Sequence, residues 1–379
     1  MTLSTGTLRP LFHRKTLGPT HAKQIYGTLA SMNEVTTGLY VESRKNLGNN
    51  PNLVRIRSGV YFDSSVLTDS MQRWDLRREM TRLRCEAQSL TRKGSGAAPI
   101  FTGEAALCLW GTETWFTVPD LQAWRADGTK TRWHYELPPV SINGEEISGC
   151  TYRTIEGTRL GSESYLVHGC QVVSEVEAVV DLARYGHPLQ TIMAASAVMR
   201  KLSGFTIFDQ EEPRKKAEEI RQEMLAILRS TSHRYRTAEA AILAADPGCD
   251  GPGEAFMRWQ LAMVTDINEV VTQRKITQNG HTYYIDAAVK GTRCGWEFDG
   301  SGKVDAALEA RNKFLSRQND LLQAGVRLMR LSTADYRDPA ATLQKVLHHL
   351  HACGVVTRAP SKYLNKAFPP AFFDSSRRN

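Results

Sequence analysis

The N-terminal part of the chain shows two different periods of apolar residues. Residues 21–32 repeat apolar side chains at helical spacing, whereas residues 53–62 alternate between apolar and polar types and are interrupted by Ser58 and Gly59. The first pattern predicts a helix and the second predicts a short hairpin. Because a helix followed by a hairpin wing is typical of small winged-helix DNA-binding domains, we expect such a region within residues 1–70.

Helical periodicity dominates the middle of the chain. Residues 71–93 predict a helix with an apolar stripe, whose many arginines form either a solvated basic face or a phosphate-contacting face. Strands are expected within residues 165–173, followed by two helices separated by a Gly-His-Pro break at 186–188. A further helix over 211–229, capped by Asp209, carries alternating charges and is expected to be a surface connector.

A Pro- and Gly-rich loop at 246–253 marks the expected last domain boundary. Glu254 opens a predicted helix directly after this loop. Further along, residues 304–324 predict a second helix and residues 325–331 predict a strand. The order helix, hairpin, helix, strand indicates an α/β arrangement in the C-terminal third of the chain.

Residues 282–299 predict a hairpin that carries three acidic residues. Its centre reads Lys-Gly-Thr-Arg, which suits a two-residue turn with glycine in first place. If Lys290 pairs with Arg293, Asp286 lies directly opposite Glu297. Regular alternation then gives an acidic face and an apolar face. The acidic face has Tyr284, Asp286, Ala288, Gly295, Glu297 and Asp299, and the apolar face has Ile285, Ala287, Val289, Cys294, Trp296 and Phe298.

Opposing carboxylates repel each other and raise each other's pKa, so a sheet gains no stability from them. A divalent cation would remove this conflict, because hard cations such as Mg²⁺ prefer carboxylate oxygens. The alternative is that the acids are solvent-exposed hairpin residues paired with Lys290, Arg293 or Lys303. Two features favour the metal site: Glu254 opens the helix that precedes the hairpin, and the following helix and strand set the acids near the centre of an α/β arrangement.

Several of these motifs resemble a known nuclease branch. They are G-P-G-E ending at Glu254, I-D-A around Asp286, W-E-F-D-G-S-G-K at 296–303, Arg317, and A-G-V-R-L-M-R-L at 324–331. They are similar to the very-short-patch-repair-like branch of the PD-(D/E)XK nuclease superfamily. Upstream, L-V-R-I-R-S-G-V-Y-F-D, F-T-G-E-A-A-L-C-L-W-G and V-V-S-E-V-E-A-V-V-D-L-A-R resemble the recurrent patches of AbiEi-type antitoxin regions, as in an actinobacterial architecture.

The resemblance implies a restriction-endonuclease-like mixed sheet flanked by helices. It divides the α/β chain into a winged-helix-like region (1–70), an AbiEi-like middle domain (71–245), a nuclease-like domain (250–355) and a tail (356–379). The tail either docks on the body or on a partner, or is loose.

Site roles follow from the same resemblance. Asp286 and Glu297 would be ligands of Mg²⁺ or Mn²⁺, and Glu254 would bind a second cation or orient the attacking water. The usual lysine is replaced by Asp299, as is typical of this branch, and Lys303 would supply the missing cation. Arg317 would support the site from the following helix.

The charge of the chain indicates a polyanionic partner. The net charge is +8, and residues 1–100 contain 15 Lys/Arg against 7 Asp/Glu, so a polyanion would meet the N-terminal segment first. We therefore expect DNA as the partner, with RNA not excluded. The residues assigned to nucleic-acid contacts are Arg55, Arg57, Arg73, Arg77, Arg78 and Arg317.

Other composition features exclude several classes. No apolar run reaches the roughly 18 residues of a membrane span, and the start lacks the apolar region of a signal peptide, so a cytoplasmic protein is expected. The 7 cysteines contain no C-x-x-C pair, which argues against a disulfide framework and a zinc site. His348, His349 and His351 are accordingly interpreted as surface or dimer residues.

The sequence thus predicts a metal-dependent endonuclease acting on DNA, with a role in phage or plasmid defence. Two alternatives remain open: an antitoxin-type DNA-binding regulator with an inactive nuclease fold, and a module that only holds a partner protein. A second copy of the chain and a protein of a defence system are the further partners considered.

Overall fold

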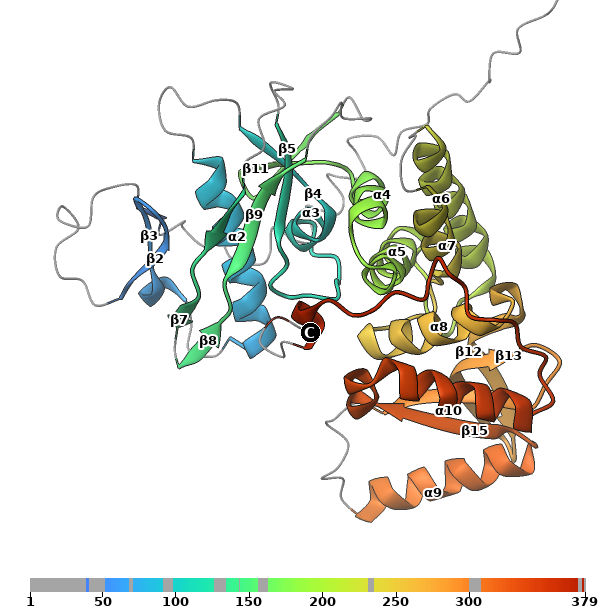
Figure 1. Ribbon diagram of the computed structural model, residues 1–379. Helices are drawn as coiled ribbons and strands as arrows, with labels where there is room; N and C mark the ends of the chain where they lie inside the picture. Colours follow the sequence, from blue (N-terminus) through green and yellow to red (C-terminus); the bar gives the residue numbers. More distant parts are fainter. Residues whose placement is uncertain are drawn as a thin grey trace, which may run out of the picture.

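The computed structural model describes residues 39–40, 52–67, 71–90, 98–125, 134–142, 144–155, 163–230, 235–299, 308–373 and 377 (Figure 1). Within these residues the chain is a mixed α/β protein with four sheets and nine α-helices, which agrees with the expected fold class. The predicted helix at 21–32 lies outside the described residues. No described helix is long and apolar enough to cross a membrane.

A small three-stranded sheet contains the hairpin predicted at 53–62. Its strands are β1 (Leu39–Tyr40), β2 (Leu53–Arg57) and β3 (Val60–Asp63), in the order β1-β3-β2. The β2–β3 turn contains Gly59, whose φ of 74° is a conformation that glycine adopts without strain. The hairpin predicted here is therefore confirmed. Arg57 ties it to helix α2 (Arg73–Ser89) by donating to the carbonyl oxygens of Ala87 and Leu90.

The middle of the chain is built on a six-stranded mixed sheet in the order β10-β11-β4-β5-β9-β6. The predicted strand region at 165–173 is itself a hairpin, with His168 and Gly169 in the turn. Its strands and the neighbouring elements are β4 (Pro99–Thr102), α3 (Gly103–Leu109), β5 (Leu121–Arg125), β6 (His134–Leu137), β7 (Val140–Ile142), β8 (Glu145–Ile147), β9 (Cys150–Thr154), β10 (Tyr165–Val167) and β11 (Cys170–Val172).

Four helices follow this sheet: α4 (Glu175–Tyr185), α5 (Pro188–Ser203), α6 (Glu211–Arg229) and α7 (Tyr235–Ala244). The break at 186–188 occurs as predicted, because the His187 side chain caps α5 by accepting from the Leu189 amide. The predicted cap of α6 is wrong, since Gln210 is the N-cap residue and makes no side-chain cap bond. Nor is α6 only a surface connector: Ile220, Met224 and Leu228 bury one face in the core.

The C-terminal unit contains a four-stranded sheet in the order β12-β13-β14-β15. The first three strands are antiparallel, and β15 runs parallel to β14. Helices α8 and α10 lie on one side of this sheet and α9 lies on the other (Figure 1). The elements are α8 (Pro252–Val264), β12 (Val270–Gln278), β13 (His281–Val289), β14 (Cys294–Asp299), α9 (Leu308–Gln323), β15 (Arg327–Ser332) and α10 (Pro339–Ala352).

The loop expected to separate the last domain is packed into the protein and is not an exposed linker. Asp246 is buried and accepts from the Gly248 amide at 2.8 Å. One apolar core then continues from α5 and α7 through α8 into the C-terminal sheet. Leu364 and Phe372 belong to the same core, and the Arg377 carbonyl accepts from the amides of two residues that precede β5, so the tail docks on the body.

Candidate functional site

The hairpin that carries the acids has the register expected from the sequence. Ala287 pairs with Trp296 and Ala288 pairs with Gly295, which is the predicted register, and the ladder between β13 and β14 ends there, before Asp286 and Glu297. The turn differs from the predicted one, because the Thr292 amide donates to the Val289 carbonyl oxygen at 3.3 Å, which makes Lys290 and Gly291 the central residues, with Gly291 at a φ of 66°. The register predicted for the hairpin is therefore confirmed.

The two faces of the hairpin are only partly as predicted. Ala287, Val289 and Trp296 pack toward α8 in the expected apolar face. Ile285, expected beside them, instead packs with Leu321 and Val326 on the α9 side. The alternation along β13 is therefore interrupted at Asp286.

A local change in the backbone explains this interruption. On β12, Thr272 pairs with Ala287 and Arg274 pairs with Ile285, but Gln273 between them has a φ of 50°. A left-handed residue breaks the pleat on which the period-2 rule rests. Tyr284, expected on the acidic face, accordingly contacts Phe208, which lies in the segment before α6. The irregularity at Gln273 thus lies beside the predicted central metal ligand.

Glu254 meets this irregularity from the start of α8. Its Oε2 accepts from the Gln273 amide group and from the Asp250 backbone amide, both at 3.1 Å. Burial, followed by the negative charge of Asp286, raises the pKa of Glu254 to about 8. Glycine at position 253 lets the start of α8 lie close to β14, because a Cβ there would be 2.1 Å from the Phe298 ring.

Asp286 is the residue that couples the predicted acids. Its Oδ2 accepts from the Phe298 amide at 2.9 Å. Its charge raises the pKa of Glu254 and also that of Glu297, where burial is the larger cause. Asp286 therefore lies close enough to both Glu254 and Glu297 for its negative charge to act on each of them.

Glu297 and Asp299 have arginine partners, of which Arg317 was expected to support the site and Arg330 was not expected. Glu297 is only 3% exposed and forms ion pairs with Arg317 and with Arg330, the latter at 2.7 Å. Arg330 also donates to both carboxylate oxygens of Asp299, at 2.8 and 2.9 Å. The alternative in which exposed acids pair with Lys290 or Arg293 is therefore wrong for Glu297, since α9 and β15 cover it.

Arg330 was missed as a partner because its position depends on strand pairing. The parallel ladder between β14 and β15 sets Arg330 beside Glu297, which no local motif reveals. Lys303, the cation expected from sequence, lies outside the described residues. Among the described residues, the one group of three potential ligands with all ligand atoms within 4.8 Å is Cys294, His349 and Cys353, so the acids do not form a closed triad.

The arginines assigned to nucleic acid lie in different surroundings. Arg55 is exposed, while Arg57 is used in binding the end of α2. Arg73 and Arg77 both form ion pairs with Glu145, and the Arg77 side chain is only 5% exposed. A phosphate contact by Arg57 or Arg77 would require breaking the bond of Arg57 to α2 or the ion pair of Arg77 with Glu145. Arg78 reaches Glu113 at 3.9 Å, and Arg317 belongs to the acidic site.

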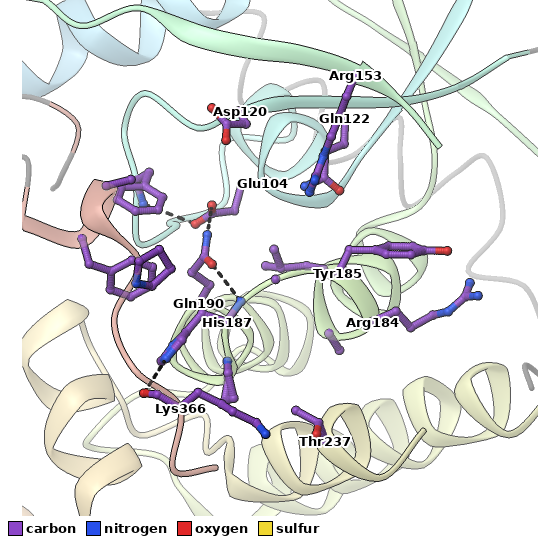
Figure 2. Close-up of a pocket in the computed structure, with 18 of the residues that line it drawn as sticks. Glu104, Asp120, Gln122, Arg153, Arg184, Tyr185, His187, Gln190, Thr237 and Lys366 are labelled. Carbon is purple, nitrogen blue, oxygen red and sulfur yellow. Dashed lines mark hydrogen bonds between the residues drawn. The ribbon is translucent and has the colours of Figure 1, made fainter. Parts of the chain in front are cut away.

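A separate cavity of about 800 Å³ lies among the middle sheet, the α4–α5 junction and the C-terminal tail. Figure 2 shows Gln190 reaching toward Glu104 on one wall, with His187 next to Lys366. Gln190 donates to Glu104 at 2.6 Å, and burial raises the pKa of Glu104 to about 7. Burial lowers the pKa of His187 to about 4. No motif in the sequence pointed to this cavity.

Glu104 is expected to make stability depend on pH. Its pKa of about 7 exceeds the usual 4.5, so its contribution to stability is complete below about pH 4.5 and is lost as pH rises through about 7. The difference corresponds to about 3 kcal/mol. Glu104→Gln, which mimics the protonated carboxyl, should therefore exceed the wild type in Tm at pH 8 and match it more closely at pH 5. The exposed Glu211→Gln is the control, and parallel curves for Glu104→Gln and wild type would contradict the prediction.

Comparison of the chain with protein-family models, with curated proteins and with solved structures finds no significant match. The resemblance to a nuclease branch and to antitoxin regions therefore stays a prediction.

Proposed function

We propose that the C-terminal unit is a metal-dependent nuclease that hydrolyses phosphodiester bonds of DNA. One observation carries the proposal: the charge of Asp286 raises the pKa of both Glu254 and Glu297. Three carboxylates from a helix and two strands thus share one site at a cost to the folded protein. A bound divalent cation would remove that cost.

The arrangement of the unit supports the proposal. A helix, three antiparallel strands, a second helix and a parallel strand follow one another, and the acids lie on the first helix and the two central strands. This order is what the restriction-endonuclease-like fold implied by the resemblance requires. The finer fold assignment is part of the proposal.

The proposed roles follow from the contacts. Asp286 and Glu297 would hold Mg²⁺ or Mn²⁺, and Glu254, already fixed by Gln273, would orient the water or bind a second cation. When bound, the cation lowers the pKa of a coordinated water and offsets charge on the phosphate. Glu297 would exchange its arginine partners for the cation, which leaves Arg317 and Arg330 to bind phosphate oxygens. Lys303 keeps its predicted role of neutralising developing charge.

One observation favours the alternative of a DNA-binding regulator with an inactive nuclease fold. Arg317 and Arg330 already neutralise Glu297 without any cation. In that case the protein would bind DNA and leave it intact. A role in phage or plasmid defence would be compatible with either activity.

The test is incubation of the full chain with supercoiled plasmid and with single-stranded DNA, in Mg²⁺, Mn²⁺ or EDTA. We expect nicking or linearisation that requires the cation and that is absent from Asp286→Asn. Glu269→Gln, an exposed acid of the same unit, is the matched control and should cut like the wild type. DNA binding without cutting in either cation would reject the nuclease and favour the regulator.

A further inference from the structure

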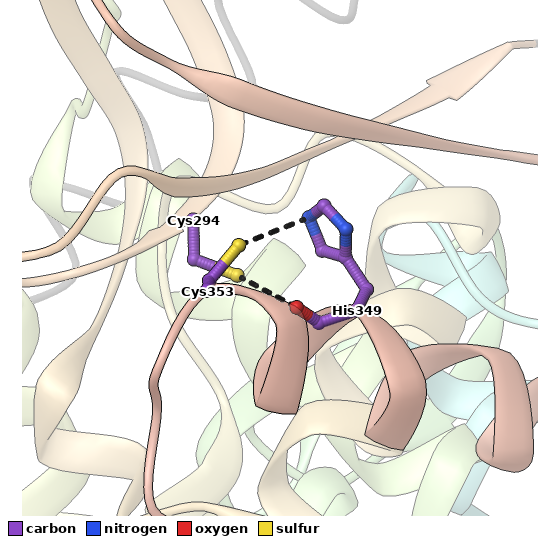
Figure 3. Close-up of side chains that lie close together, drawn as sticks. All are labelled: Cys294, His349 and Cys353. Atoms are coloured by element: carbon purple, nitrogen blue, oxygen red, sulfur yellow. Dashed lines mark hydrogen bonds between the residues drawn. The ribbon is translucent and has the colours of Figure 1, made fainter.

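Three potential metal ligands, two thiols and one imidazole, converge at the opposite end of β14 from the acids. Cys294 begins β14, and His349 and Cys353 lie one helical turn apart at the C-terminal end of α10. Their ligand atoms all lie within 4.8 Å of one another. Figure 3 shows the two sulfur atoms side by side, with the imidazole turned toward Cys353.

Packing between α10 and the sheet holds this group in place. The His349 ring meets the Trp296 ring edge to face at a centroid distance of 5.1 Å, and its Nε2 lies 3.3 Å from the Gly295 carbonyl oxygen. The Sγ of Cys353 lies 4.0 Å from that same Nε2. Positions four residues apart share one helix face, so His349 and Cys353 point together toward Cys294.

The absence of a C-x-x-C pair in the sequence argued against a zinc site, but these three ligands do not need such a pair. His349, interpreted from the sequence as a surface or dimer residue, is half-buried and lies beside two cysteines. Cys353 follows His349 by four residues, and the strand-to-helix packing brings Cys294 to both. The local His-x-x-x-Cys spacing was the available signal.

We propose that Cys294, His349 and Cys353 bind a thiophilic divalent cation, with Zn²⁺ as the best fit. Two thiolates and one imidazole match the donor preference of Zn²⁺ and do not suit Mg²⁺. Cys294 is fully buried while the other two residues are half-buried, so water can take a fourth position. Binding transfers the two thiol protons to the buffer as both sulfurs coordinate the cation.

The proposed site is independent of the acidic site, although both involve β14. Cys294 and Trp296 face the α8 and α10 side, whereas Glu297 faces Arg317 of α9. A cation at Cys294 would join the first residue of β14 to the end of α10. Its role would therefore be to stabilise the strand that carries Glu297 and Asp299.

The experiment is a titration of the reduced, EDTA-treated full chain with Zn²⁺ against a chromogenic chelator, with Co²⁺ as a spectroscopic probe. We expect one Zn²⁺ per chain, thiolate-to-Co²⁺ absorption, and a higher Tm with Zn²⁺ than with EDTA. His349→Ala and Cys353→Ser should each weaken binding at least about tenfold and remove the Tm increase. The matched controls are His351→Ala on the same helix and Cys108→Ser, another half-buried thiol, and both should bind like the wild type.

Two results would overturn the proposal. One is the absence of stoichiometric Zn²⁺ binding by the reduced wild type. The other is equal binding by the wild type and the Cys353→Ser variant. Formation of a Cys294–Cys353 disulfide in a chain that binds no Zn²⁺ would assign the cluster to thiol oxidation instead. None of these measurements involves DNA, so they stand or fail separately from the nuclease proposal.

Discussion

Asp286→Asn is expected to reduce cation-dependent DNA cleavage at least about 100-fold, because it removes a charged ligand from the predicted metal site. Asparagine keeps an oxygen that can accept from the Phe298 amide. It also removes the charge that raises the pKa of Glu254 and Glu297. Cleavage should therefore be lost with little change in Tm.

Initial rates of plasmid cutting across Mg²⁺ and Mn²⁺ concentrations measure this effect, with thermal unfolding in EDTA as the companion measurement. Glu269→Gln should keep both the rate and the Tm of the wild type. Cutting by Asp286→Asn at the wild-type rate would show that catalysis, if present, lies elsewhere. A large fall in Tm would point to a structural role for Asp286.

Asp246→Ala is expected to have the largest effect on stability, about 3–5 kcal/mol, because it leaves a buried cation without its partner. Asp246 accepts from the Gly248 amide and from Thr272, and it forms ion pairs with Arg214 at 3.0 Å and Arg258 at 3.7 Å. Arg258 is only 3% exposed. Burial raises the pKa of Asp246, but the positive charges of Arg258 and Arg214 are the main opposing effect, and the net result is a lowered pKa.

Urea unfolding at neutral pH measures the loss. Asp246→Asn should lose less, since it can still accept from the Gly248 amide. Asp209→Ala is the control, because Asp209 is exposed and does not cap α6, and its effect should stay within about 0.5 kcal/mol. A loss below about 1 kcal/mol for Asp246→Ala would contradict the proposed anchoring of the loop before Glu254.

The pKa of Asp246 also fixes the direction of a pH effect. A carboxyl with a lowered pKa in the folded state contributes stability above its unfolded pKa and loses it as pH falls through the folded value. The difference between wild type and Asp246→Ala should therefore shrink in acid. This trend is opposite to that expected for Glu104.

Features that depend only on residues close together in the sequence were predictable in this chain. The hairpin around Gly291 has the predicted register at Ala287–Trp296 and Ala288–Gly295, and the Gly-His-Pro break separates α4 from α5. The start of α8 also follows from the Pro- and Gly-rich loop before it, although the helix begins at Pro252 and Glu254 lies in its first turn. In each case neighbours within a few residues decide the backbone conformation.

Where the site departs from the prediction, distant parts of the chain are responsible. The left-handed Gln273 on β12 redirects the side chains of β13 around Asp286. The parallel pairing of β14 with β15 brings Arg330 to Glu297 and Asp299. A charge count along the chain cannot show that these acids already have arginine partners.

The sequence by itself determined the hairpin with its three acids, its register, and the approximate positions of helices such as α2, α5 and α8, because these follow from local backbone preferences and side-chain periodicity. Only the tertiary structure decided which cations face those acids, that the tail docks, and that Cys294 meets His349 and Cys353. These contacts join residues tens to hundreds of positions apart, and they exist because burial of the shared core brings their elements together.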